Sequence, residues 1–458
     1  MNSNEKLRMI ADLMLILGVR SVTNSALGRI ACQSKIENIA KGMGFKAERK
    51  AMGQVLVISP KGLKGVPKLG IIVHSDTVDT DEKKWRADPY GEIIGDRVYG
   101  RGVIDDKMGI IVSLYAMHEL EGKINPSWQI IIGSREEDEW TDMRDYFVEN
   151  NPAPEFSITV DGDGIQHGCR GTANVMFYFN EGKGFDDIKN ISVVKPQWNV
   201  TPAEILVETD DFYDRICAKA MHSSIAMLRE ENAIYKLAKK YKEALQRQFP
   251  GAYEFIEGSS KGKNAEGIFI PTIPETLKKE GFPESSISMT MLKTQFGKLG
   301  IGLNVRLGPG ITKSNLDEAL DKVDKTYGCT HEIFGCTFSS YISPKSKEIE
   351  MMLASYKKVL GKETQSTFAL GTGYNATFPN CAIFGPRFAV DHDEEDFCHC
   401  VDENRRIEDI YRFEEMLEDF IGNYLKIWEK KEKSYGFSPS FFVGIIKNAR
   451  IVTLTVLT

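Results

Sequence analysis

Short apolar runs alternate with amphipathic helical patterns up to about residue 165, and this alternation restricts the chain to a few folds. The runs at 70–73, 128–133 and 156–160 are typical of buried strands, whereas residues 108–121 are typical of a helix that follows a turn. Strands that alternate with helices predict an α/β domain with a mostly parallel sheet. Because ligands bind beyond the carboxyl ends of such strands, the residues after each run are the first candidates for a functional site.

The length of 458 residues is too great for one compact core, so we expect two domains of unequal size. Residues 1–167 and 343–433 carry the α/β pattern, and residues 168–342 between them predict an inserted α+β domain that could act as a lid. The apolar tail at 434–458 follows a charged run, and no function is assigned to it. The patterns behind this division are helices at 226–247, 345–360 and 407–430, and strands at 174–180, 299–307 and 381–384.

The composition argues against several classes of protein. The net charge of −7 lacks the basic footprint of a nucleic-acid-binding protein. No run of about 18 apolar residues is present, and the apolar stretch at 9–19 is interrupted by Asp12, so neither a membrane span nor a secretory signal is expected. The eight cysteines follow no paired spacing, which favours a reducing cytoplasm over a disulfide scaffold.

Acidic and histidine residues follow the strand runs or lie in turns at five places along the chain. They are His74 with Asp76, Asp105 with Asp106, Glu136 with Glu137, Asp161, and His399. Each has an ordinary structural explanation, because such residues also end strands, cap helices, form turns or cover solvated surfaces. The alternative is chemical: imidazoles and carboxylates bind cations, and of two adjacent glutamates one can bind metal while the other acts as a general base.

The order of these groups along the chain resembles the M20 family of zinc metallopeptidases. The shared pattern is His-x-Asp, Asp-Asp-Lys, Glu-Glu, Asp, and His-x-x-Asp-Glu. The segments WRADPY at 85–90, VYGRG at 98–102 and GTGY at 371–374 resemble the same family, and WTDM at 140–143 resembles its PepV-type dipeptidase branch. The resemblance covers nearly all of residues 1–430 and implies a catalytic α/β domain with an inserted lid.

The resemblance implies two divalent metal ions held by five side chains. His74 and Asp161 would be the terminal ligands of one ion. Glu137 and His399 would hold the other, and Asp105 would bridge the two. Nitrogen and oxygen ligands of this kind suit zinc, with manganese and cobalt as alternatives.

Further roles follow from the same resemblance. Asp76 would orient His74, and Glu136 would be the general base. Arg135 beside this base departs from the family pattern, and its positive charge is expected to lower the pKa of Glu136. A cis peptide bond is expected after Asp105.

Two lid residues are assigned in the same way. His222 would stabilise the developing oxyanion, unless it is only a surface residue before a helix. Arg306 would bind a substrate carboxylate, and a structural ion pair is the alternative. A lid of about 170 residues in the resembling enzymes lets one subunit supply both halves of the site, which is compatible with a monomer.

The expected function is hydrolysis of an amide bond in a small substrate, with a dipeptide as the first choice. An N-acyl amino-acid or succinyl-diaminopimelate deacylase is the alternative within the family, and a catalytically silent binding protein is the alternative outside it. Nucleophilic chemistry is not expected, because no Gly-x-Ser-x-Gly motif is present and immediate neighbours such as Cys398 and His399 rarely form a working pair.

Overall fold

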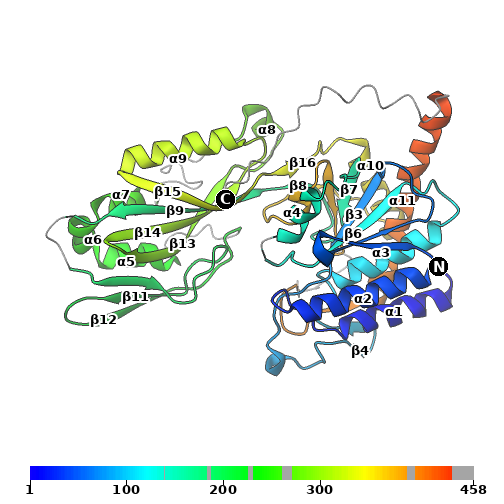
Figure 1. Ribbon diagram of the computed structural model, residues 1–458, viewed down its shortest axis with the longest axis horizontal. Helices are drawn as coiled ribbons and strands as arrows, with labels where there is room; N and C mark the ends of the chain where they lie inside the picture. The colour runs from blue at the N-terminus through cyan, green and yellow to red at the C-terminus, as the bar shows by residue number, and fades with distance from the viewer. Residues whose placement is uncertain (139, 183–186, 225–230, 260–270, 389–397, 436–458) are drawn as a thin grey trace.

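The computed structural model describes residues 1–138, 140–182, 187–224, 231–259, 271–388 and 398–435. Two sheets dominate it: a nine-stranded sheet built from both ends of this range and a seven-stranded sheet built from its middle (Figure 1). A small third sheet, in the order β19-β5-β4, joins Asn404–Arg406 to Arg97–Tyr99 and Glu92–Ile94. The expected α/β fold with an inserted α+β region is therefore confirmed, whereas the domain boundaries stay a prediction.

The nine-stranded sheet has the order β1-β2-β6-β3-β7-β18-β8-β16, and β17 pairs with β8. Its four central strands, β6, β3, β7 and β18, are parallel. The outer pairings are antiparallel, apart from the parallel pairing of β17 with β8. The strands are β1 Lys46–Lys50, β2 Val55–Ser59, β3 Leu69–His74, β6 Trp128–Gly133, β7 Phe156–Thr159, β8 Ile165–Cys169, β16 Ser340–Tyr341, β17 Thr367–Ala369 and β18 Cys381–Phe384. The predicted parallel strands thus form the centre of the sheet.

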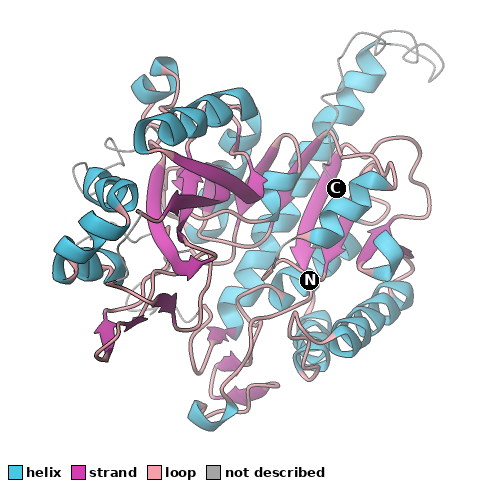
Figure 2. Cartoon of the chain, turned by 60° about the vertical axis from the view of Figure 1, so that its left-hand side comes forward, coloured by secondary structure: helices cyan, strands magenta, loops and turns pink. Residues whose placement is uncertain are grey.

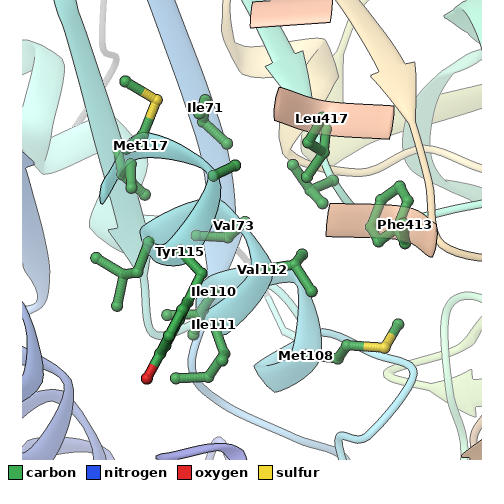
Figure 3. Packing of buried hydrophobic residues seen from close by; sticks show 14 of the residues in the cluster. Ile71, Val73, Met108, Ile110, Ile111, Val112, Tyr115, Met117, Phe413 and Leu417 are labelled. Atoms are coloured by element: carbon green, nitrogen blue, oxygen red, sulfur yellow. The ribbon is translucent and has the colours of Figure 1, made fainter. Parts of the chain in front are cut away.

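The central strands are almost wholly apolar because their side chains are buried on both faces of the sheet. Ile71 and Val73 of β3 face a core shared with the helices on one side, whereas Ile72 between them faces a second core on the other. Figure 3 shows the first core, where Ile110 of α3 lies near β3 and Phe413 belongs to α11. The helices of the first side are α1 Ser3–Leu17, α2 Ala26–Gly42, α3 Lys107–Leu120, α10 Lys347–Leu360 and α11 Ile407–Tyr435.

The second side of this sheet is covered by α4, Thr141–Val148, and the short helix η4, Tyr374–Thr377. By the same alternation His74, two residues after Ile72, is on this side, and its ring makes an edge contact with Tyr374 at 6.3 Å between centroids. This side of the sheet therefore carries the first site candidate.

The seven-stranded sheet is antiparallel, in the order β12-β11-β10-β13-β14-β9-β15, and helices cover one of its faces (Figure 2). Its strands are β9 Gly171–Asn180, β10 Asn190–Val193, β11 Glu204–Glu208, β12 Tyr213–Cys217, β13 Ser286–Gln295, β14 Lys298–Leu307 and β15 Cys329–Thr337. Its helices are α5 Ala233–Lys240, α6 Lys242–Gln248, α7 Pro250–Ser259, α8 Glu275–Lys279 and α9 Lys313–Tyr327. Val305 and Leu307 join the helix-side core, so Arg306 between them takes the opposite face.

The structure corrects one expectation for this region, and part of what was expected lies outside the described residues. The predicted helix at 226–247 is wrong, because two shorter helices, α5 and α6, meet at Tyr241 with φ −103° and ψ 28°. The Tyr241 hydroxyl donates to Asp214 at 2.6 Å, a contact across the fold that no local pattern reveals. Residues 225–230 and, of the tail, residues 436–458 lie outside the described residues. No helix in the described part of the chain combines the length and apolarity needed to cross a bilayer.

Candidate metal centre

Three neighbouring parallel strands bring the predicted ligands to one edge of the nine-stranded sheet. His74 ends β3 and is level with Gly133 at the end of β6, and Ile72 is level with Thr159 at the end of β7. The segments after β6 and β7 carry the Glu136–Glu137 pair and Asp161. Strand register therefore places these side chains around one point, as expected at the carboxyl end of a parallel sheet.

Asp105 lies at the centre of the cluster, because its two carboxylate oxygens face two different histidines. Its Oδ1 is 2.7 Å from His74 Nε2, and its Oδ2 is 3.1 Å from His399 Nε2. One oxygen of Asp161 joins the His74 side, where the ligand atoms of Asp105, His74 and Asp161 lie within 4.8 Å of one another. Glu137 Oε1 is 2.9 Å from His399 Nε2 on the other side. Asp105 thus lies between a His74–Asp161 group and a His399 that contacts Glu137, and the assignment of these side chains as two ligand sets stays a prediction.

The turn that carries Asp105 has an unusual backbone. The expected cis peptide bond between Asp105 and Asp106 is present. Asp106 stands at the N-cap position of α3 without capping it, and its Oδ2 instead accepts the backbone N–H of His74 at 3.3 Å. A Cβ on Gly109 would lie 1.9 Å from Asp106 Oδ1, so only glycine fits there. The helix-cap explanation for this aspartate pair is therefore incomplete.

Asp76 holds two parts of the site, although not in the expected manner. His74 Nδ1 is nearest to the backbone oxygen of Asp76, at 3.0 Å, and is 3.4 Å from the Asp76 carboxylate. That carboxylate accepts the backbone N–H groups of Glu136 at 3.1 Å and Glu137 at 3.3 Å, and the Thr23 hydroxyl at 2.7 Å. Asp76 therefore positions the glutamate pair as well as the histidine.

Buried Asp142 and Tyr374 hold the backbone of the segment that leads into the Glu136–Glu137 pair. Asp142 accepts the backbone N–H of Ser134 at 2.7 Å and of Arg135 at 3.1 Å, and the Tyr374 hydroxyl donates to it at 2.5 Å. Tyr374 also accepts the Arg135 N–H at 3.1 Å. Both residues belong to segments that carry the family resemblance, but the sequence assigned them no role.

Glu403 holds the backbone of the turn that carries Asp105. Its carboxylate accepts the backbone N–H groups of Gly102, Ile104 and Asp105 at 3.2, 2.8 and 3.4 Å, and Arg101 donates to it at 2.7 Å. The side chain is fully buried, so these bonds satisfy a charge that would otherwise be costly. The only sequence signal for it was its place in the His-x-x-Asp-Glu pattern.

Glu136 is close to the ligand cluster without belonging to it. A Cβ on Gly373 would lie 3.0 Å from Glu136 Oε1, and the Trp140 indole donates to the Glu136 backbone oxygen at 2.6 Å. Burial raises the pKa of the Glu136 carboxyl well above its usual value. The expectation that Arg135 lowers this pKa is wrong, because the Arg135 guanidinium pairs with Asp138 instead.

The lid histidine His222 is near enough to the cluster of the same chain for the charge of His399 to act on its ring. His222 is exposed, yet the protein around it, followed by the positive charges of Arg306 and His399, lowers the pKa of its imidazole to about 4. His222 Nδ1 is 2.7 Å from the Ser224 hydroxyl and 3.4 Å from the backbone N–H of Ser224, and where both groups donate to Nδ1 the ring proton is on Nε2. The neutral ring can therefore donate one hydrogen bond from Nε2.

Two buried arginines lie beside this histidine. The Arg306 guanidinium donates to the hydroxyls of Ser223 at 2.8 Å and Thr372 at 3.1 Å, and Arg170 donates to Ser286 at 3.2 Å. Neither has a carboxylate partner among the residues that the structure describes, so the ion-pair alternative for Arg306 gains no support. Burial, and then the charge of Arg170, lower the pKa of Arg306 to about 10. Arg170 was missed because its contacts with Ser286 and Ala369 come from segments far away in the sequence.

Comparison with known proteins identifies the family. The model of "Peptidase family M20/M25/M40" matches residues 70–423. The chain belongs to this family. It is 22% identical over 379 residues to a succinyl-diaminopimelate desuccinylase of Ehrlichia canis, which covers 79% of this chain and 84% of the relative. It is also 32% identical over 186 residues to a Beta-Ala-Xaa dipeptidase of Lactobacillus delbrueckii subsp. lactis, covering 38% of each.

Solved structures of M20 peptidases share the fold. An M20 family metallo-carboxypeptidase from Sulfolobus solfataricus aligns with a TM-score of 0.59 and 18% identity, covering 93% of this chain and 100% of that one. Human carnosine dipeptidase 1 aligns with a TM-score of 0.58 and 12% identity, covering 92% and 97%. At these identities the likeness establishes the architecture, so substrate and ligands depend on the residues themselves.

The ligand cluster fits the dinuclear metal site that an M20 peptidase requires. Burial, and then the charge of Asp105, raise the pKa of Glu137 to about 7 and of Asp161 to about 6. Carboxylates that repel one another in this way gain strongly from a cation bound between them. The donor set is all imidazole nitrogen and carboxylate oxygen, which suits zinc or manganese.

Proposed function

We propose that this chain hydrolyses the amide bond of a small substrate, a dipeptide in the first instance, at a centre of two divalent ions. The observation that carries the proposal is the meeting of six side chains from five separate segments at one sheet edge. They are His74, Asp105, Glu136, Glu137, Asp161 and His399. Zinc is the proposed metal, with manganese and cobalt as alternatives.

Each group has a task that its position allows. Ions held by the cluster would polarise the scissile carbonyl and acidify the attacking water. Glu136 takes the proton of that water and delivers it to the leaving amine. His222 donates from Nε2 to the oxygen of the carbonyl as negative charge develops there. Asp76 and Glu403 keep the glutamate and aspartate turns in place through their backbone N–H groups.

The two buried arginines, Arg306 and Arg170, support a substrate that ends in a carboxylate. Buried guanidinium groups without an acidic partner favour an anion, and Arg306 and Arg170 lie on the His222 side of the cluster. A dipeptide with a free C-terminus supplies one carboxylate. An N-succinyl diamino acid supplies more than one, and relatives of that activity cover most of the chain, so it is the second candidate. The Trp140 and Asp142 contacts favour the dipeptide, since they come from the segment that resembles dipeptidases.

A substrate panel tests this function directly. The zinc-loaded and manganese-loaded enzymes are each given dipeptides, N-acyl amino acids and N-succinyl-diaminopimelate, and kcat/KM is measured for each. We expect the highest value for a dipeptide. A preference for the succinylated substrate would replace the first candidate by the second, and no hydrolysis by a protein that carries two metal ions would favour the silent binding protein.

Arg306→Ala should raise KM for substrates with a free carboxylate. The loss of charge-assisted hydrogen bonds worth about 1.5–3 kcal/mol corresponds to about 10–100-fold in kcat/KM. The matched control is the same dipeptide with an amidated C-terminus, for which the variant and the parent should differ little. An equal loss on both substrates would mean that Arg306 only maintains the fold.

His222→Ala should lower kcat by about two orders of magnitude, as loss of an oxyanion donor does, while both metal ions remain bound. Loss of metal together with activity would place His222 in the metal site and contradict its assignment.

Mixing this variant with inactive Glu136→Gln protein tests whether one chain completes its own site. We expect no recovery of activity, and recovery would mean that two chains exchange lids.

A further inference from the structure

Cys398 lies against the proposed metal centre. Its Sγ donates to Asp105 Oδ2 at 3.1 Å, the same oxygen that faces His399. The ligand atoms of Asp105, Cys398 and His399 all lie within 4.8 Å of one another. Cys398 is half-buried, whereas Cys400, on the other side of His399, is exposed. Of these two thiols, Cys398 is the one that the structure groups with Asp105 and His399.

The ligand atoms of Asp105, Cys398 and His399 lie at spacings close to those of neighbouring ligands around one ion. Nitrogen and oxygen ligands at about 2.0 Å and a thiolate at about 2.3 Å from zinc leave about 3.3–3.6 Å between neighbouring ligand atoms. Asp105 Oδ2 is 3.1 Å from both Cys398 Sγ and His399 Nε2, and Glu137 Oε1 is 2.9 Å from His399 Nε2. These three pairwise distances are slightly shorter than the spacing of neighbouring zinc ligands, so the side chains would move apart slightly as an ion binds.

We propose that Cys398 is a further ligand of the second ion, beside Asp105, Glu137 and His399. The inference rests on the proposed two-metal function. Coordination takes place through the thiolate, and the thiol proton leaves to solvent as the ion binds. The thiol thus exchanges its hydrogen bond to Asp105 for a bond to the metal.

The thiolate would distinguish the two ion sites. The ion held by His74 and Asp161 has nitrogen and oxygen ligands alone, which accept zinc, manganese or cobalt. A sulfur ligand on the second ion selects zinc or cobalt over manganese and magnesium, because thiolates are soft donors. The second site should therefore retain zinc in manganese-rich buffer while the first site exchanges.

Cobalt substitution of the full chain gives a test that does not depend on activity. Thiolate bound to cobalt(II) produces a charge-transfer absorption band in the near ultraviolet, which oxygen and nitrogen ligands do not. We expect the band in the parent protein and in Cys400→Ser, the matched control, and its loss in Cys398→Ser. Cobalt content is measured on the same samples.

The outcomes separate this inference from the function on which it rests. Two bound cobalt ions without the band, or a band that survives in Cys398→Ser, would overturn the thiolate ligand and leave the metal centre intact. A parent protein that binds no cobalt would overturn both. As a second measurement, Cys398→Ser should bind its second zinc ion at least about tenfold more weakly in a chelator competition, and unchanged affinity would contradict the proposal.

Discussion

Glu136→Gln should lower kcat by at least about two orders of magnitude while both metal ions stay bound, because it removes the group that accepts the proton of the attacking water. Glutamine has nearly the same shape but is not a base. The backbone of this turn is held by the Asp76 carboxylate and the Trp140 indole, and neither contact involves the side chain that is replaced. The variant should therefore fold, and steady-state kinetics together with metal analysis check the expectation.

Asp138→Asn is the matched control for this substitution. Asp138 lies two residues further along the same turn and pairs with Arg135, on an exposed part of the turn. Its loss removes a surface ion pair of small energetic value and should leave kcat within a few-fold of the parent. Near-normal turnover by Glu136→Gln would refute the general base, and an equal loss in both variants would show that the turn, rather than the carboxylate, was damaged.

Asp105→Ala should abolish metal binding and activity together. Asp105 is the one residue of the cluster that faces both His74 and His399, so its removal leaves each ion with an incomplete ligand set. The fall in activity should be at least as large as that caused by loss of the base. Glu403 continues to hold the backbone of the turn, so the fold should survive, as circular dichroism can show.

Asp163→Asn serves as the comparison for this variant. Asp163 is two residues from Asp161, is not one of the proposed ligands, and pairs at 2.6 Å with Arg387, whose charge also acts on Asp161. It should keep two metal ions per chain and most of the activity. A folded Asp105→Ala protein that still held two ions would contradict a shared, bridging aspartate.

The parallel centre of the sheet could be predicted because burial on both faces makes each strand a continuous apolar run, as at 70–73 and 128–133. The meeting of His74, Glu137 and Asp161 at one sheet edge could be expected because they follow parallel strands, whereas Asp105 and His399 were singled out only by the order of the family pattern. The groups that hold the ligands could not, since Asp142 meets Tyr374 across 232 positions of the chain. Likewise, the burial of Arg170 and the break at Tyr241 depend on contacts between distant segments, which local periodicity does not contain.

Anomalous diffraction from a zinc-loaded crystal, recorded on both sides of the zinc absorption edge, tests the central claim most directly. The proposed function predicts two zinc peaks, one between His74 and Asp161 and one between Glu137 and His399, with Asp105 bridging them. No anomalous peak among these side chains, or zinc bound only elsewhere on the protein, would contradict the proposed two-metal hydrolase.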